Sequence, residues 1–382
     1  MKLLKQIKKG APFAIGAVLI LTGCSSSDTD SETKSEQKLD VEFSKSKGCS
    51  QDEYSAKAGV LKVNAINTGD NSGELEVLKG DRILGEVEKV LPSQEKVFSV
   101  KLDEGEYKFL CGSKSGETAV LTISKNSTGN NNEAIEKELA DDVVQYKEYI
   151  LEQTAQLQVD VKVFTDAIRA NNVEAAKAAY PKSRQAWERI EPIAELFLKF
   201  DIAIDARVDD FENEKDPEFK GYHKLEWFLF EKNTTEGAAK FADQLDADIA
   251  DLQVELTSLE IDPFVMTKGP QGLMEEVANG KITGEEDRYS GTDLYDFEAN
   301  LEGSDKVIEI LEDEISAQDA GFVAEYTKSV ENVRNILNEY KVSETEFKNY
   351  EELTKEDINK LKVLIADLSE KLAEVPGILG IE

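Results

Sequence analysis

One histidine stands in the whole chain, and an acidic residue follows it at helical spacing. His223 and Glu226 lie three positions apart in the segment Gly-Tyr-His-Lys-Leu-Glu-Trp-Phe-Leu-Phe. Residues three apart share one face of a helix, so the imidazole and the carboxylate can reach one common point. The apolar residues of this segment recur at roughly helical spacing, which predicts a helix packed against apolar neighbours. Such a pair can share a metal ion; it can equally be a buried, hydrogen-bonded histidine beside an unrelated surface glutamate.

Acidic residues gather at three other places in the same half of the chain. The ones at helical spacing or in compact groups are Glu188, Glu191, Asp205 and Glu286. Each group alone is typical of a solvated face in an acidic protein. Together with His223 and Glu226 they form an oxygen-rich set with one imidazole, and helix bundles build metal sites from inward carboxylates in this way. Oxygen ligands with one or two nitrogens suit iron or manganese, and zinc is an alternative.

The composition narrows the class of partner. The chain has 382 residues, which predicts two or three domains, and 40% of them are hydrophobic, as in folded proteins. The formal net charge is −33, and the first 23 residues carry four lysines and no acid, so the remainder is more acidic still. This charge argues against nucleic acid and against electrostatic docking on anionic lipid. It favours cations, although an acidic surface that only maintains solubility has the same composition.

The start of the chain has the pattern of an export signal. A basic segment precedes an apolar run over residues 11–21, which is too short to span a bilayer and typical of a signal peptide. The Leu-Thr-Gly-Cys sequence ending at Cys24 resembles the lipobox of bacterial lipoproteins; an ordinary signal peptide with an incidental cysteine is the alternative. We therefore predict a signal peptide over 1–23 and a tether over 24–38. The protein would lie on the extracytoplasmic face of the cell membrane, anchored by acyl chains on Cys24.

Two domains follow the tether. Residues 39–125 contain short alternating runs separated by turn signals, which predicts an all-β sandwich. A polar run introduces a linker over 126–134, and residues 135–382 show long helical periodicities joined by short loops, which predicts an all-α bundle. The predicted fold class is therefore multidomain, with a sandwich followed by a helical bundle.

The sandwich contains two cysteines. Cys111 ends a Tyr-Lys-Phe-Leu-Cys run that looks like the last ligand strand of a cupredoxin, but the domain has no histidine and no methionine, which excludes blue copper. Outside the cytoplasm, Cys49 and Cys111 are expected to form a disulfide. The alternative is a thiolate and carboxylate metal site with Glu74 or Glu76 and Glu106.

The chain as a whole resembles the imelysin-like family with an N-terminal cupredoxin-like domain. In the helical half the likeness is carried by Phe-Thr-Asp-Ala-Ile (164–168), Glu-Arg-Ile-Glu-Pro-Ile-Ala-Glu (188–195), Ile-Asp-Ala-Arg (204–207), His-Lys-Leu-Glu (223–226), Gly-Glu-Glu-Asp-Arg-Tyr-Ser (284–290) and Asn-Leu-Glu-Gly-Ser (300–304). In the β half it is carried by Glu-Leu-Glu-Val-Leu-Lys-Gly (74–80) and by residues 106–112.

The resemblance implies a function and two sites. Members of this architecture are thought to bind iron, as Fe²⁺ or Fe³⁺, and to hand it to a membrane permease, with a secreted haem peroxidase as third partner. The family's metal site maps onto His223, Glu226, Glu188, Glu191, Asp205 and Glu286. Its proposed second site, for which copper or zinc are candidates, maps onto Cys49, Glu74, Glu106 and Cys111. This second mapping keeps the metal interpretation of the cysteines open beside the disulfide.

Three functions remain after these observations. The leading hypothesis is an iron-binding transport component with no enzymatic activity. A metallopeptidase is the first rival because imelysins have been counted among peptidases, but such zinc sites take two histidines from one helix and this chain has one histidine. A cell-surface binding protein, whose acidic groups only face solvent, is the second rival.

Overall fold

The computed structural model describes residues 37–114, 116–126, 133–194 and 196–381. Residues 36–382 form one compact unit. The predicted lipobox at Cys24 lies outside the described residues. Among those described, no helix is long and apolar enough to cross a membrane.

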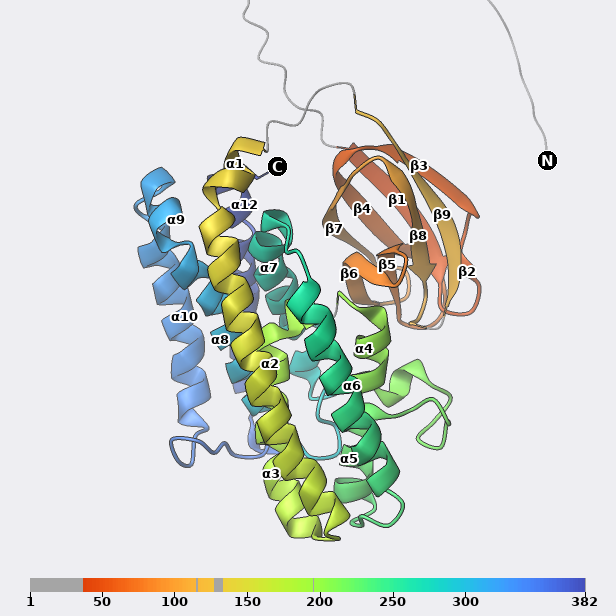
Figure 1. Cartoon of the computed structure of the whole chain (residues 1–382), viewed down its shortest axis with the longest axis vertical. Coiled ribbons are helices and arrows are strands. Elements are labelled where there is room, and N and C mark those ends of the chain that lie inside the picture. Colours follow the sequence, from red (N-terminus) through yellow and green to blue (C-terminus); the bar gives the residue numbers. More distant parts are fainter. Residues whose placement is uncertain (1–36, 115, 127–132, 195, 382) are drawn as a thin grey trace, which may run out of the picture. The chain divides into compact units, whose positions relative to one another are not determined.

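The N-terminal part of the unit is a β-sandwich (Figure 1). Its strands are β1 (Gln37–Ser44), β2 (Gly48–Cys49), β3 (Glu53–Lys57), β4 (Gly59–Asn67), β5 (Gly73–Lys79), β6 (Arg82–Val90), β7 (Glu95–Leu102), β8 (Gly105–Cys111) and β9 (Glu117–Ser124). One sheet has the order β2-β1-β4-β7 and the other β3-β9-β8-β5-β6. The pairs β1–β4 and β3–β9 are parallel, and the remaining pairs are antiparallel.

Side-chain alternation along β5 separates the inside of the sandwich from its outside. Leu75 and Val77 are fully buried in the core between the sheets, so Glu74 and Glu76 point to the outer face of the second sheet. Further along the same outer face, Leu78 packs with hydrophobic residues of β6 and β8. One sheet of the sandwich therefore has two buried faces, and the outer one carries acidic residues.

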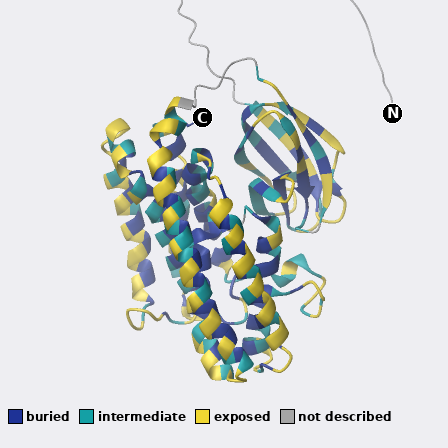
Figure 2. Cartoon of the chain, viewed as in Figure 1, coloured by how far each residue is buried: buried dark blue, intermediate teal, exposed yellow. Residues whose placement is uncertain are grey.

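The C-terminal part, from residue 133 on, is helical, so the predicted fold class is confirmed. Its α-helices are α1 (Glu133–Glu138), α2 (Ala140–Arg169), α3 (Val173–Ala194), α4 (Leu198–Ile204), α5 (Gly221–Glu226), α6 (Ala239–Ser258), α7 (Pro263–Asn279), α8 (Asp293–Ile310), α9 (Glu312–Gln318), α10 (Phe322–Glu339), α11 (Lys355–Leu372) and α12 (Val375–Ile378). Short 3-10 segments occur at Val208–Asp210, Lys281–Thr283 and Tyr350–Glu352, and a π-helical segment at Trp227–Glu231 follows α5. Figure 2 shows exposed residues along the outer sides of the long helices, while one large apolar cluster fills the space between them.

Two local predictions about helices are wrong. The periodicity predicts one helix over 173–200, but α3 ends at Ala194 with Pro192 in its last turn, and α4 begins separately at Leu198. An Asp-Pro pair after a helical periodicity predicts a stop, but Asp262-Pro263 starts α7. The Asp262 side chain accepts a hydrogen bond from the Phe264 N–H, and Pro263 stands in the first turn, where no N–H is needed.

Candidate metal centre

A close approach of two helix ends positions the histidine. Helix α5 starts at Gly221, whose φ is +75°, and a Cβ atom there would lie 2.3 Å from the Ile204 carbonyl oxygen. Only glycine allows this contact together with this backbone conformation. The start of α5 is thus held against the end of α4. Asp205 follows α4 directly, so this packing brings Asp205 and His223 together.

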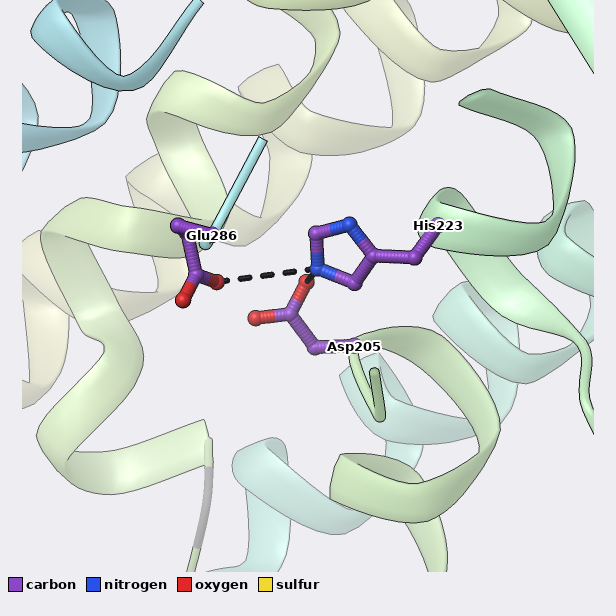
Figure 3. A group of neighbouring side chains, drawn as sticks. All are labelled: Asp205, His223 and Glu286. Carbon is purple, nitrogen blue, oxygen red and sulfur yellow. Dashed lines mark ion pairs between the residues drawn. The ribbon is translucent and has the colours of Figure 1, made fainter. Parts of the chain in front are cut away.

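The Nε2 atom of His223 faces two carboxylates. It lies 3.5 Å from Asp205 Oδ1 and 3.6 Å from Glu286 Oε1 (Figure 3). The ligand atoms of these three residues lie within 4.8 Å of one another, and all three side chains are buried. Asp205 comes from the end of α4, His223 from α5 and Glu286 from the loop before α8, so this group of three is assembled from separate parts of the chain.

The Nδ1 atom of His223 faces a different carboxylate. Glu226 Oε2 lies 3.2 Å from Nδ1, and Glu226 Oε1 accepts hydrogen bonds from the backbone N–H groups of Tyr289 (2.9 Å) and Ser290 (2.8 Å). Asp287 completes a second group of ligand atoms on this side. A carboxylate that accepts a hydrogen bond from one ring nitrogen fixes the orientation of the ring and leaves the other nitrogen for a metal. His223 and Glu226 are neighbours, as the spacing predicts, but Glu226 lies on the other side of the ring from Asp205 and Glu286.

A buried arginine lies between the acids of the centre. Arg184 on α3 is fully buried, and its guanidinium pairs with Glu188 and Asp205. The same group lies 3.2 Å from Glu286 Oε1 and 3.1 Å from Asp296 Oδ2. One cation therefore neutralises part of the charge of at least four carboxylates.

A buried lysine has the same role for the remaining predicted acids. Lys281 pairs with Glu191, and its Nζ lies 3.4 Å from Glu188 Oε2 and 3.7 Å from Glu286 Oε1. Asn300 Nδ2 donates to Glu191 Oε2 at 2.7 Å and to Glu188 Oε2 at 3.1 Å. Glu188 and Glu191 thus lie beside the His223 group and are engaged by Lys281 and Asn300.

The proline in the last turn of α3 contributes to this arrangement. Pro192 has no N–H, so the carbonyl of Glu188, four residues earlier, loses its helical partner. Asn300 Nδ2 donates to that carbonyl at 3.1 Å. The break in the helix therefore gives α8 a polar contact with α3 at the level of the acidic side chains.

The pKa values reflect this balance of charges. Burial and Arg184 lower the pKa of His223, but hydrogen bonds to Asp205, Glu226 and Glu286 outweigh them and raise it well above its usual value. Burial raises the pKa of Asp205, and Arg184 and His223 more than reverse this, so the net pKa is lowered. The pKa of Glu286 is likewise lowered, because Lys281, Arg207 and His223 overcome its burial. The two acids on the Nε2 side are therefore held in the charged form that metal ligation needs.

The predicted second site is divided in the structure. Cys49 and Cys111 form a disulfide with a Cα–Cα distance of 5.3 Å, so their sulfur atoms are not available as thiolates in this state. Glu106 is exposed on β8, and Glu74 is buried on the outer face of the second sheet. Of the groups of three metal-ligand atoms that the described residues form, none includes any of these four residues.

Sequence reasoning missed the cations of the centre. Arg184 precedes Glu188 by one helical turn, which is a signal for an ion pair but not for burial. Lys281 lies in a short 3-10 segment after α7 and has no such pattern. Asp287 stands next to Glu286, and its contacts, including a 2.8 Å hydrogen bond from the Tyr180 hydroxyl, depend entirely on tertiary structure.

Comparison with known proteins gives consistent matches to both halves. The family model described as imelysin matches residues 143–375, and the one described as cupredoxin-like domain matches residues 13–130. A protein of Escherichia coli O1:K1 / APEC named iron uptake system component EfeO is 40% identical over 339 residues, which cover 88% of this chain and 90% of that protein. Proteins of the same name from E. coli K12 and Shigella flexneri are 39% identical over the same lengths.

Proposed function

Because the chain belongs to the imelysin family, as one of the EfeO-type iron uptake components, we propose that it binds iron at the Nε2 side of His223 and delivers it to a membrane permease. The observation that supports this most directly is the convergence of the ligand atoms of His223, Asp205 and Glu286 within 4.8 Å. One imidazole with two carboxylates is a donor set that suits iron.

The residues around the ion have different roles in this proposal. His223, Asp205 and Glu286 are the ligands, and Glu226 orients the imidazole through Nδ1. The backbone N–H groups of Tyr289 and Ser290 hold Glu226 in turn. Glu226 is therefore a positioning residue in this proposal, although the sequence motif makes it a ligand.

Arg184 and Lys281 supply positive charge to the acids when iron is absent. Arg184 contacts both Asp205 and Glu286, so an incoming ion competes with the guanidinium for the same oxygens. Lys281 lies near Glu286 and near the two acids of α3. Such competition keeps the centre assembled without metal and limits how tightly iron is held, which favours release to a second protein.

The cellular setting is part of the proposal. Lipid modification of Cys24 would keep the protein on the extracytoplasmic face of the cell membrane, within reach of a permease. A secreted haem peroxidase is the other expected partner of the system. We assign no catalytic residue to this chain, so we expect that the metal-loaded protein does not hydrolyse peptides. A peptide-hydrolysis assay measures this.

The test is iron titration of the full-length mature protein under anaerobic conditions. Replacing Glu226 with Gln removes an outer partner and should weaken Fe²⁺ binding by about 10–100-fold. His223→Ala removes a ligand and should weaken binding more than Glu226→Gln does. Glu285→Gln is the matched control, because Glu285 is adjacent to the site in sequence but pairs with Lys89. Unchanged iron binding and unchanged iron-limited growth with His223→Ala would overturn the proposal.

A further inference from the structure

A cleft ends beside the candidate centre without reaching its ligands. It has a volume of about 230 Å³, and its lining comes mainly from β6, β7 and α7, together with Arg207. His223, Asp205 and Glu286 are not among the described residues that line it. One water molecule takes up about 30 Å³ in the liquid, so the cleft has room for an ion that keeps some of its water. Solvent therefore comes close to the centre, and Arg207 lies where the two meet.

The side chain of Arg207 stands between the cleft and Glu286. One terminal nitrogen of its guanidinium pairs with Glu286 Oε2, and the other lies 2.8 Å from Glu88 Oε2 on β6. The planar group is thus held across the inner end of the cleft by one acid on each side. An ion that follows the cleft inward meets Arg207 before it meets Glu286.

The two oxygens of Glu286 face different groups. Oε1 lies 3.6 Å from His223 Nε2, 3.2 Å from Arg184 and 3.7 Å from Lys281. Oε2 points away from the imidazole (Figure 3) and pairs with Arg207. The side chains of Arg184 and Lys281 are 0% and 2% exposed, whereas that of Arg207 is 19% exposed. Of these three cations, Arg207 is therefore the one that solvent reaches.

Displacement of Arg207 by a metal cation is an exchange of one positive charge for another. The carboxylate of Glu286 is never left buried without a partner, which is the costly state for such a group. Arg207 keeps its contact with Glu88 on the cleft wall. Its backbone is held separately, because the Arg207 N–H donates to Asp210 Oδ2 at 3.2 Å. The guanidinium can thus leave Glu286 by side-chain rotation, without a movement of Asp205 two residues earlier.

Glu88 is suited to hold the displaced guanidinium. Burial raises the pKa of Glu88, but Lys114 and Arg207 more than reverse this and lower the pKa to about 2. Lys114 Nζ lies 3.2 Å from Glu88 Oε1, the oxygen that Arg207 does not use, and 2.6 Å from Asp201 Oδ2 on α4. Glu88 is therefore a charged partner whose position is fixed by a second contact.

We propose that the cleft is the route by which the ion enters and leaves the His223 centre, and that Arg207 closes its inner end. The inference rests on the proposed binding of iron at His223. When the centre is empty, Arg207 occupies Glu286; when an ion binds there, the guanidinium turns to Glu88 and still covers the ion. Arg207 therefore slows exchange of the ion in both directions.

The test measures the rate of Fe²⁺ release from the anaerobically loaded, full-length mature protein to the chelator ferrozine by stopped flow, beside the equilibrium affinity for Fe²⁺. Arg207→Met should release Fe²⁺ about 10-fold faster, as expected for loss of one hydrogen bond to a charged group. Its affinity should not fall, because a competitor for Glu286 is removed. Arg189→Met is the control, since Arg189 has a similar exposure of 23% but pairs with Glu302 outside the cleft. It should leave both quantities unchanged.

A second variant narrows the cleft without touching the centre. Gly272 on α7 lines the cleft, and a Cβ atom there would meet no atom within 4 Å. Gly272→Trp should slow the uptake and the release of Fe²⁺ by the same factor, so that the affinity stays as it is. Val254→Trp, at a 71% exposed position of α6, is the control and should change neither rate.

The outcomes separate the route from the site itself. Rates that either Arg207→Met or Gly272→Trp leaves unchanged would overturn the route, while Fe²⁺ binding that depends on His223 would still support the site. Faster release together with weaker binding in Arg207→Met would also overturn it, because that result means a damaged centre. If Fe²⁺ binding does not depend on His223, the proposed function fails and the route fails with it. Circular dichroism and urea unfolding check that each variant is folded.

Discussion

Two groups of buried carboxylates in this chain differ in how their charge is balanced. In the helical centre, Arg184, Lys281 and His223 lie among the acids, and the pKa values of Asp205 and Glu286 are lowered. On the outer face of the second sheet, Lys114 and Arg207 pair with Glu88, and the pKa values of Glu74, Glu76 and Glu86 are raised. The comparison shows that burial alone does not decide the pKa of an acid, because neighbouring charges of both signs shift it as well.

The same difference predicts opposite responses to removal of one charge. In the helical centre, each cation is shared among several acids, so its loss leaves them unpaired. On the outer face of the second sheet, Glu74, Glu76 and Glu86 are repelled by neighbouring acids, so neutralising one of them relieves that repulsion. The following changes test this contrast.

Arg184→Met should have the largest effect. It leaves Asp205 and Asp296 without their main cation in a buried place, and should lower the free energy of unfolding by about 3–5 kcal/mol. Urea unfolding of the metal-free protein measures this. Arg169→Met is the control, since Arg169 makes comparable ion pairs at the surface and should cost at most about 1 kcal/mol. Equal effects of the two changes would contradict the contrast.

Gly221→Ala should follow in size. The added Cβ meets the Ile204 carbonyl and the backbone conformation becomes strained, so we expect a loss of about 2–3 kcal/mol in the free energy of unfolding. Iron affinity should fall as well, because His223 is displaced from Asp205. Gly237→Ala has a similar φ of +83° but only a distant contact, at 3.9 Å, so it isolates the effect of backbone strain. A loss no greater at Gly221 than at Gly237 would show that the close approach is unimportant.

Glu76→Gln should stabilise the metal-free protein. The change removes a buried charge that has no partner and relieves repulsion with Glu74 and Glu86, so the free energy of unfolding should rise by about 1 kcal/mol at slightly alkaline pH. Glu106 lies on β8, on the same sheet face but exposed, so Glu106→Gln should change the free energy of unfolding little. Destabilisation by Glu76→Gln would mean that the carboxylate has a cationic partner in solution.

The pH dependence of stability should be the smallest effect, and it is specific to the buried acids on the outer face of the second sheet. Burial, followed by repulsion from Asp210, raises the pKa of Glu74 from 4.5 to about 8, although Lys114 opposes this. A carboxyl with a raised pKa binds its proton more tightly in the folded state. Its contribution is therefore fully present below about pH 4.5 and is lost as the pH rises through about 8.

Glu74 should therefore make the free energy of unfolding of the metal-free protein fall as the pH rises from about 4.5 to about 8. Urea unfolding at several pH values measures this. The charged groups that face Glu74 are Glu76, Glu88, Lys114, Asp201 and Asp210. Glu76→Gln should flatten the slope because Glu76 itself has a raised pKa and its own titration is removed. An unchanged slope in this variant would argue against coupled titration on the outer face of the second sheet.

Much of the fold could be predicted because its signals are local. Alternation along 39–43 and 97–102 corresponds to β1 and β7, and helical periodicity over 355–372 corresponds to α11. Strand β6 could not be predicted, because charged residues at Glu86 and Glu88 replace the alternation that marks a half-buried strand. Helix α7 could not be predicted from a pattern in which Asp262-Pro263 indicates a stop.

The sequence indicated which residues could belong to the candidate centre, but not how their side chains are arranged around His223. His223 and Glu226 follow from helical spacing, the acidic groups supplied Asp205 and Glu286 as candidates, and the resemblance mapped these residues onto the family's site. Nothing in the spacing tells which ring nitrogen faces which acid, because that depends on how α4, α5 and the loop before α8 pack. Lys281 has no signal at helical spacing, and its partners Glu188 and Glu191 are far away in the sequence.

The sequence by itself determined the family, the order of a sandwich and a helical domain, the supply of carboxylates and the single imidazole. These properties depend on residue identity and on short-range periodicity. The tertiary structure alone decided that Asp205 and Glu286 share one side of His223, that Arg184 and Lys281 neutralise the helical acids, and that Glu76 is buried without a partner. Charge balance inside a protein depends on distances between residues remote in sequence, and only the folded chain fixes those distances.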